Sequence, residues 1–313
     1  MSLLAAFDIC LAATTIVIAL WTTVVRSTFP AIVGFVIYGL LLALVWVRLS
    51  AVDVALTEAA IGSGITGVLL LSAAARLRGN AVSRSPLGLK MRVLTAILCA
   101  AVTAGLAAVV LLPPDPIPTL APRAMAYLDT LQIGNGVAAV LKAYRALDTL
   151  LEAVVLLIAL VGVWSLAPDD AWGGRPAAWR SPAGSDALTF AARILPPIGI
   201  VAGIYIVWVG ADEPGGAFQG GAILAAMWLL AMMAGLVAPP RVGTTWLRVS
   251  LVLGPGMFIL VGLAGFLLAG DFLAYPAGFA KPLMVLIEVA LAPSIAVTLA
   301  MMVAGPPVRA DEP

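Results

Sequence analysis

Hydrophobic residues occur in nine long runs that short polar stretches separate. The runs cover residues 4–25, 29–49, 54–75, 93–112, 150–166, 194–210, 218–237, 247–269 and 283–303. An α-helix rises about 1.5 Å per residue, so about 20 apolar residues cross the roughly 30 Å of hydrocarbon in a bilayer. The pattern predicts an all-α polytopic membrane protein with about nine transmembrane helices. The runs at 150–166 and 194–210 are short, so we expect these two helices to tilt or to use interfacial flanks.

Composition agrees with a membrane protein and excludes several function classes. Hydrophobic residues make up 63% and charged residues 11% of the chain, and the mean hydropathy is +1.12. The net charge of +1 and the lack of a basic patch interleaved with aromatic residues argue against a nucleic-acid partner. The chain has no histidine and two cysteines, Cys10 and Cys99, in separate runs. These residues supply neither a haem, zinc or iron–sulfur site nor a catalytic triad, so we expect no metal, no cofactor and no enzyme activity.

The distribution of lysine and arginine predicts the orientation in the membrane. With the N-terminus outside, twelve of the 17 basic residues fall in cytoplasmic loops and five on the other side. Because cytoplasmic loops carry the excess of positive charge, we expect the N-terminus outside and the C-terminus in the cytoplasm. The expected location is the cell inner (plasma) membrane, as a multi-pass protein in contact with the lipid bilayer.

Polar and proline-rich loops divide the chain into three blocks. The first block (1–92) has three predicted spans and ends in a basic loop. The second block (93–180) has two spans, joined by a Pro-rich stretch at 113–118 and a segment at 124–133 that we expect at the membrane interface. The third block (181–313) has four spans and follows a stretch rich in Gly, Pro and charge, as is typical of a linker.

Glu58 is an acid inside an apolar run. A charge at the centre of a bilayer costs about 2.5 to 3.5 kcal/mol on insertion scales, so such residues usually face a bundle interior or an ion path. Gly62 lies one helical turn further on the same face and leaves room beside the carboxylate. We therefore take Glu58 as a candidate for ion translocation.

A second group of charges precedes and enters the fifth span. Lys142, Arg145, Asp148 and Glu152 are spaced three or four residues apart, which places them on one stripe of a continuous helix. We take all four as candidates for ion translocation, although Lys142 could instead anchor the helix at the lipid headgroups. Glu152 falls just inside the apolar run, where a proton-relay role is the interpretation we favour.

The segment 210–221 joins the sixth and seventh spans and combines small residues with oxygen-bearing side chains. Asp212, Glu213 and Gln219 offer oxygen ligands of the kind that hard cations prefer, although loop acids are often simply solvated. The residues expected to shape a tight turn and close helix packing are Pro214, Gly215, Gly216 and Gly220.

Glu288 lies well within the last predicted span. Pro293 follows one turn later and frees a backbone carbonyl. Glu288 is therefore a further candidate for ion translocation, and a hydrogen bond in helix packing would explain it equally well.

Three motifs resemble parts of one family, the Mrp-type multisubunit sodium/proton antiporters. Segment 53–62 resembles the three-span module at the carboxyl end of their large A-type chain, an MbhD-like module that forms a separate chain in Mbh-type membrane-bound hydrogenases. Segments 135–141 and 144–152 are similar to the two-span MbhE-like module of those hydrogenases. Segments 214–221 and 287–291 are similar to the four-span B-type chain of the antiporters, known as MnhB or MrpB. The three likenesses follow the order of the three blocks.

The resemblance implies a membrane subunit of a multisubunit cation/proton (Na+/H+) antiporter complex. Its partners would be large antiporter-like subunits and small membrane subunits, and Na+ and H+ would be the transported ions. By this likeness Glu58, Asp148 and Glu152 would handle the ions. Two alternatives remain: a membrane arm of a membrane-bound hydrogenase or related respiratory complex, and a structural scaffold that holds larger pumping subunits together.

Overall fold

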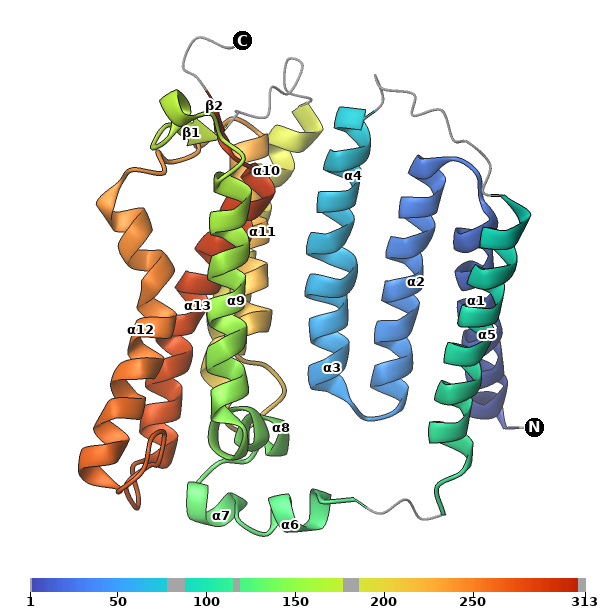
Figure 1. Cartoon of the computed structure of the whole chain (residues 1–313). Helices are drawn as coiled ribbons and strands as arrows, with labels where there is room; N and C mark the ends of the chain where they lie inside the picture. The colour runs from blue at the N-terminus through green and yellow to red at the C-terminus, as the bar shows by residue number, and fades with distance from the viewer. Residues whose placement is uncertain (1, 78–87, 115–118, 177–185, 309–313) are drawn as a thin grey trace.

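The computed structural model describes residues 2–77, 88–114, 119–176 and 186–308, and nearly all of them lie in helices that run roughly side by side (Figure 1). The long helices are α1 (Leu3–Val24), α2 (Thr28–Arg48), α3 (Val52–Thr57) continued by the π-helical η1 (Glu58–Ile65) and α4 (Thr66–Leu77), α5 (Leu89–Leu111), α9 (Ala146–Trp164), α10 (Asp186–Val209), α11 (Ala217–Met233), α12 (Thr245–Leu268) and α13 (Ala280–Ala304).

These helices form a polytopic all-α membrane fold, as the hydrophobic pattern predicts. Eight helical segments in the described part of the chain are long and apolar enough to cross a membrane, and α11 is a ninth apolar helix of 17 residues. Helix α1 starts at one end of the bundle and α13 finishes at the other, as an odd number of passes requires (Figure 1). Which end faces the cytoplasm stays a prediction. Four arginines that entered that prediction, Arg78, Arg84, Arg180 and Arg309, lie outside the described residues.

Two predicted helix lengths are wrong. The run at 194–210 belongs to a helix of 24 residues, α10, which begins at Asp186 and contains Pro196 and Pro197. An acid in the first turn suits the positive end of a helix, so the helix extends beyond its apolar part. The short helix is instead α11, which ends at Met233 rather than at residue 237.

Short elements close the two ends of the bundle. At the end where α1 begins lie α6 (Ala121–Met125), α7 (Leu128–Leu131), α8 (Gly136–Ala139) and the π-helical η2 (Val140–Tyr144) (Figure 1). At the opposite end, after the 3-10 turn η3 (Asp169–Ala171), strand β1 (Arg175–Pro176) pairs antiparallel with β2 (Pro307–Val308). The segment expected at the interface thus forms short helices beyond the ends of the long ones.

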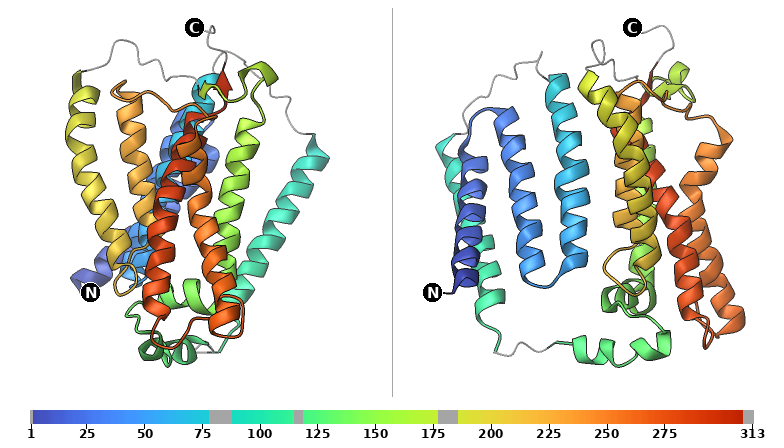
Figure 2. Two further views of the ribbon diagram at one scale, coloured as in Figure 1. Left: turned by 90° about the vertical axis from the view of Figure 1, so that its left-hand side faces the viewer. Right: turned by 180° about the vertical axis from the view of Figure 1, so that it is seen from behind.

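The largest core packs around α13. Side chains from α11, α12 and α13 bury one another, among them Phe258, Ile287 and Ile295. Helices α10 and α11 can approach closely because Gly220 has no side chain. A Cβ at this position would lie only 2.6 Å from the carbonyl oxygen of Gly203. The helices of the first block stand to one side of this bundle, and η1 contacts α11 (Figure 2).

Candidate functional site

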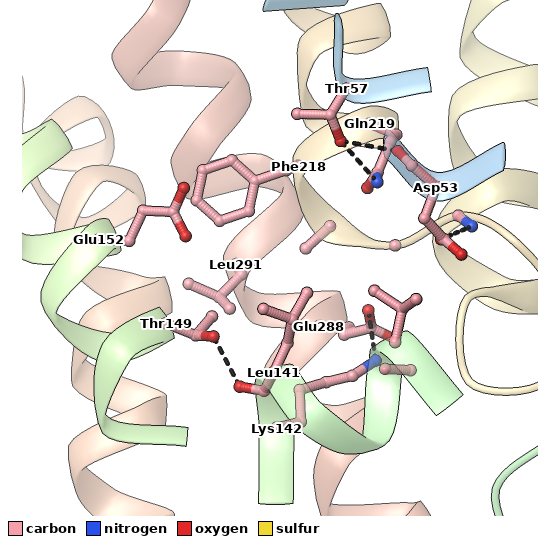
Figure 3. Close-up of a pocket in the computed structure, with 15 residues that line it drawn as sticks. Asp53, Thr57, Leu141, Lys142, Thr149, Glu152, Phe218, Gln219, Glu288 and Leu291 are labelled. Carbon is pink, nitrogen blue, oxygen red and sulfur yellow. Dashed lines mark hydrogen bonds and ion pairs between the residues drawn. The ribbon is translucent and has the colours of Figure 1, made fainter. Parts of the chain in front are cut away.

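Lys142 and Glu288 form a buried ion pair between the second and third blocks. The Lys142 Nζ atom lies 2.8 Å from Glu288 Oε1, and both side chains are almost fully buried, with 6% and 5% of their surfaces exposed. Figure 3 shows the pair at the edge of a cavity. Removing one partner of such a pair leaves an uncompensated charge in a medium of low dielectric constant, which is strongly unfavourable.

A break in the helix turns Lys142 toward Glu288. The chain is π-helical over Val140–Tyr144, Arg145 leaves the helical region with φ −131° and ψ 36°, and α9 begins at Ala146. The Arg145 amide donates to the Val140 carbonyl, five residues back. Single π-helical turns of this kind occur frequently at functional sites.

Two side chains satisfy carbonyl groups at this break. The Thr149 hydroxyl donates to the Leu141 carbonyl at 2.6 Å, and the Tyr275 hydroxyl donates to the Lys142 carbonyl at 2.7 Å. Burial raises the pKa of the Tyr275 phenol above its ordinary value, so that it remains a hydrogen-bond donor. Both bonds stabilise the interrupted helix in the part of the chain that carries Lys142.

The prediction of one continuous charged stripe is therefore wrong. Lys142 points inward, whereas Arg145 and Asp148 pair with each other at 2.5 Å on the surface, where 71% and 51% of their side chains are exposed. Glu152, one turn further along α9, is exposed at the edge of the same cavity that Glu288 lines. The break separates these four residues into a buried cation, a surface ion pair and a carboxylate at the cavity.

The cavity has a volume of about 190 Å³ and receives residues from all three blocks. Since a water molecule occupies about 30 Å³ in the liquid, the space is large enough for several. Its polar lining includes Asp53, Thr57, Lys142, Glu152, Gln219 and Glu288. Charged and polar side chains from all three blocks thus meet at one cavity beside the buried ion pair.

Asp53 and Asn135 join the three blocks at this cavity. Asp53 accepts a hydrogen bond of 2.9 Å from the Gly215 amide, and both of its carboxylate oxygens lie 3.4 Å from Asn135 Nδ2. Asn135 Nδ2 also donates to the Glu213 carbonyl at 3.0 Å, while its Oδ1 caps α8 by accepting from the Val137 amide at 2.8 Å. We did not single out either residue from the sequence, although an Asn at a helix start is a typical N-cap.

The oxygen-bearing side chains of the 210–221 segment have separate partners. Asp212 pairs with Lys281 at 2.6 Å and accepts from the Gly134 amide at 3.1 Å; the Lys281 ammonium holds the pKa of this carboxyl below its usual range. Gln219 Nε2 donates to Thr57 Oγ1 at 3.1 Å, and Glu213 is exposed. No three acidic, Cys or His side chains cluster as a metal site within the described ranges. The structure thus does not bring the expected ligands of this turn to one point.

The glycines of the turn allow the close approach of backbone to Glu288. After Pro214, Gly215 and Gly216 have φ values of +155° and +134°, which side-chain-bearing residues rarely adopt. A Cβ on Gly216 would lie 2.8 Å from Glu288 Oε1. Gly216 therefore not only shapes the turn, as expected, but also leaves room for the Glu288 carboxylate of the buried ion pair.

Glu58 lies apart from this cavity, against helix α2. It begins η1 and is partly buried, and its Oε1 atom would lie 2.5 Å from a Cβ on Gly62 and 3.0 Å from a Cβ on Gly39. The structure records no ion pair for Glu58 within its described residues. The carboxylate packs against Gly39 of α2 and against Gly62, which follows it in η1.

Family models match the first and third blocks. Residues 13–79 match the MbhD family, described as the D chain of MBH, and residues 187–306 match the domain related to the MnhB subunit of Na+/H+ antiporter. Both ranges fall inside the blocks expected from the loops, and the exact boundaries of the blocks stay a prediction.

Solved structures and one curated relative resemble larger parts of the chain. A chain of the Mrp complex from Dietzia sp. DQ12-45-1b is 25% identical with a TM-score of 0.73, over 97% of this chain and 35% of that one. A chain of the membrane-bound sulfane sulfur reductase, an archaeal respiratory membrane complex, is 27% identical with a TM-score of 0.51, over 68% of this chain and 97% of that one. An uncharacterized protein of Methanocaldococcus jannaschii is 30% identical over 162 residues, which are 47% of this chain and 62% of that protein. The chain therefore spans less than two thirds of the curated relative and about one third of the Mrp-complex chain.

Proposed function

Since the chain is a fusion of Mrp-type antiporter modules, we propose that it works as a membrane subunit of a multisubunit cation/proton antiporter that exchanges Na+ and H+. In this proposal the chain contributes buried charges to ion translocation and acts beside large antiporter-like subunits.

The buried pair of Lys142 and Glu288 carries the proposal. Two charges 2.8 Å apart interact strongly where water is scarce, so a proton that arrives at Glu288 removes most of the attraction that holds Lys142. The helix break at Arg145 separates the segment with Lys142 from α9, so in this proposal that segment shifts while α9 stays straight. Proton occupancy at Glu288 would then be coupled to the position of a positive charge beside the cavity.

Acids at two edges of the cavity extend this function to a path. Glu152 lies at the side formed by α9, and Asp53 lies where the three blocks meet (Figure 3). Ionisable groups inside membrane proteins commonly line ion and proton routes. We assign Glu152 and Asp53 to the two ends of the proposed ion path, and the ion pair of Lys142 and Glu288 to its centre.

A redox-driven complex is the second candidate. The similarity to a chain of the sulfane sulfur reductase favours it, since the same fold serves there in a respiratory membrane complex. In that case the ion modules would be the same, and electron transfer in partner subunits would supply the energy. A purely structural role is the third candidate. In that case, substitutions that remove the charges of the acids within the membrane would leave transport intact.

Purification in mild detergent followed by identification of the co-purifying chains tests the proposal first. Antiporter subunits alone support exchange, and iron–sulfur or nickel–iron subunits support the redox complex. Reconstituted vesicles then test the site: we expect Glu288→Gln to abolish sodium-dependent proton flux in an assembled complex, and Asp129→Asn, at an exposed acid, to leave it unchanged. Undiminished flux in Glu288→Gln would favour the scaffold.

A further inference from the structure

A second, polar hollow lies at the end of the bundle where α9 and α13 finish. It has a volume of about 360 Å³, and its lining includes Asp170, Trp172, Arg175 and Arg241. These residues come from the segment that follows α9, which contains η3 and β1, and from the loop that precedes α12. The cavity beside the buried ion pair is lined by other residues and adjoins η2, which lies at the opposite end of the bundle (Figure 1).

Hydrogen bonds between loops fix the backbone that carries the two arginines. Arg175 lies in strand β1, which pairs with β2. The Val242 amide donates to the Gly174 carbonyl at 2.8 Å, and Val242 is only 1% exposed, which anchors the neighbouring Arg241. Both guanidinium groups therefore start from fixed positions, and a ligand that binds them has less conformational freedom to remove.

The charges of the hollow favour an anion. Arg175 and Arg241 are exposed, and no ion pair involves either of them in the part of the chain that the structure describes. Asp170, the acid in the lining, is already engaged in another interaction. Guanidinium groups bind phosphate through pairs of parallel hydrogen bonds, so two of them at one hollow suit a phosphate group.

The hollow lies where lipid headgroups are expected. Helix α9 ends at Trp164, α12 begins at Thr245 and α13 ends at Ala304, and all three are long and apolar enough to cross a membrane. The segments that line the hollow adjoin these three ends. At the same end, Trp172 and Trp246 are 53% and 52% exposed, and exposed tryptophans are typical of the interface between membrane and water.

We propose that this hollow binds the headgroup phosphate of an anionic phospholipid. Arg175 and Arg241 donate to the phosphate oxygens, and Trp172 packs against the part of the lipid just below the headgroup. Basic pockets at the ends of transmembrane helices bind such headgroups in other membrane proteins. We choose a lipid over a free phosphate ion because the arginines are combined with an exposed tryptophan at the membrane surface.

A bound lipid would connect two blocks of the chain. Arg175 belongs to the second block and Arg241 to the third, so a phosphate held by both joins their loops at this end of the bundle. The inference does not rest on the proposed function, because it involves neither the transported ions nor the acids within the membrane.

Native mass spectrometry of the purified complex in detergent, with added dioleoyl phosphatidylglycerol, tests the site. We expect Arg175→Gln and Arg241→Gln each to weaken binding about tenfold, as loss of one charged hydrogen-bond donor would. Arg175→Lys keeps the positive charge and should weaken binding less. Dioleoyl phosphatidylcholine, whose headgroup has no net charge, should bind more weakly than phosphatidylglycerol to the wild type.

Arg92→Gln is the matched control, because Arg92 is an exposed arginine in the first turn of α5, at the same end of the bundle (Figure 1). It should leave binding unchanged. Thermal unfolding gives a second measurement: phosphatidylglycerol should raise the melting temperature of the wild type and of Arg92→Gln, but not that of the double variant Arg175→Gln/Arg241→Gln.

The outcomes separate a defined site from general attraction to a basic surface. Equal losses in Arg92→Gln and Arg175→Gln, or equal binding of the two lipids by the wild type, would overturn the site. Inorganic phosphate that displaces phosphatidylglycerol at a similar concentration would show that the ligand is a soluble anion. Lipid binding that depends on both arginines, in a complex without sodium-dependent proton flux, would uphold the site and refute the antiporter.

Discussion

The hydroxyl of Tyr275 donates a hydrogen bond of 2.7 Å to the backbone carbonyl of Lys142. Tyr275 lies in the loop between α12 and α13, and Lys142 is the residue whose ammonium group pairs with Glu288. A single hydrogen bond from the third block thus satisfies a carbonyl of η2, at the place where the chain must stay interrupted for Lys142 to reach Glu288.

Tyr275→Phe should loosen this break without changing the packing of the ring. A buried carbonyl left without a partner costs about 1 to 3 kcal/mol, and we expect a loss of stability of that size. The measurement is hydrogen exchange of the amides from Val140 to Arg145 in the detergent-solubilised protein, where protection should fall.

Tyr205→Phe is the control for this change, since Tyr205 on α10 is 63% exposed. Hydrogen exchange should stay the same in the control. Full protection of η2 in Tyr275→Phe would show that the hydroxyl does not hold the break.

Replacing either Lys142 or Glu288 alone should destabilise the protein far more than replacing both. Removing one partner of a buried pair costs about 3 to 5 kcal/mol, whereas apolar replacement of both is often neutral. We expect Lys142→Met and Glu288→Leu to destabilise the complex separately, and the double variant to regain thermal stability but not proton flux.

The surface ion pair of Arg145 and Asp148 serves as the comparison for the single and double variants of Lys142 and Glu288. Because both side chains are more than half exposed, Arg145→Met should cost less than about 1 kcal/mol. Proton flux in a stable Lys142→Met/Glu288→Leu double variant would show that the buried pair only holds helices together.

Much of the fold follows from the sequence because lipid imposes a simple rule. A helix that satisfies its own backbone must cover the hydrocarbon with apolar residues, so the apolar runs predict the long helices of the described chain. The glycines at 215, 216 and 220 also signal close backbone packing, which the structure has at each of them.

The helix break at Arg145 could not be predicted in the same way. No Gly or Pro interrupts 137–152, so the spacing of Lys142, Arg145 and Glu152 indicates one continuous helix. The interruption is stabilised by Thr149 and Tyr275, and Tyr275 is remote in the sequence. The contacts between Asp53 and Asn135 likewise depend on how the blocks pack, about which local periodicity gives no information.

Asp212 should make a stability contribution that depends on pH. Its pKa is lowered, first by the hydrogen bond from Lys281 and further by the Gly134 amide, so the charged carboxylate is favoured in the folded protein. The contribution is therefore complete above the ordinary pKa of 3.8 and is lost as the pH falls through the lower pKa of the folded protein. Since the side chains are partly exposed, we expect less than about 1 kcal/mol.

Thermal unfolding of the wild type and of Asp212→Asn between pH 6 and pH 3 measures this contribution. At pH 6 the wild type should be more stable than Asp212→Asn, and this difference in stability between the two proteins should shrink as the pH falls below 4. A difference that stays constant over this range would mean that the charge of Asp212 does not stabilise the turn.

Gly216→Ala should disturb the ion pair from the backbone side. The φ of +134° strains any residue with a Cβ by about 1 to 3 kcal/mol, and the new methyl group would lie 2.8 Å from Glu288 Oε1, inside van der Waals contact. Gly215→Ala carries comparable strain, since φ is +155° and its Cβ would lie 2.5 Å from the Ile206 carbonyl oxygen, but it does not touch Glu288. We therefore expect similar thermal destabilisation in the two variants and a larger loss of proton flux in Gly216→Ala. Equal loss of flux in both would mean that strain in the turn, and not displacement of Glu288 from Lys142, limits transport.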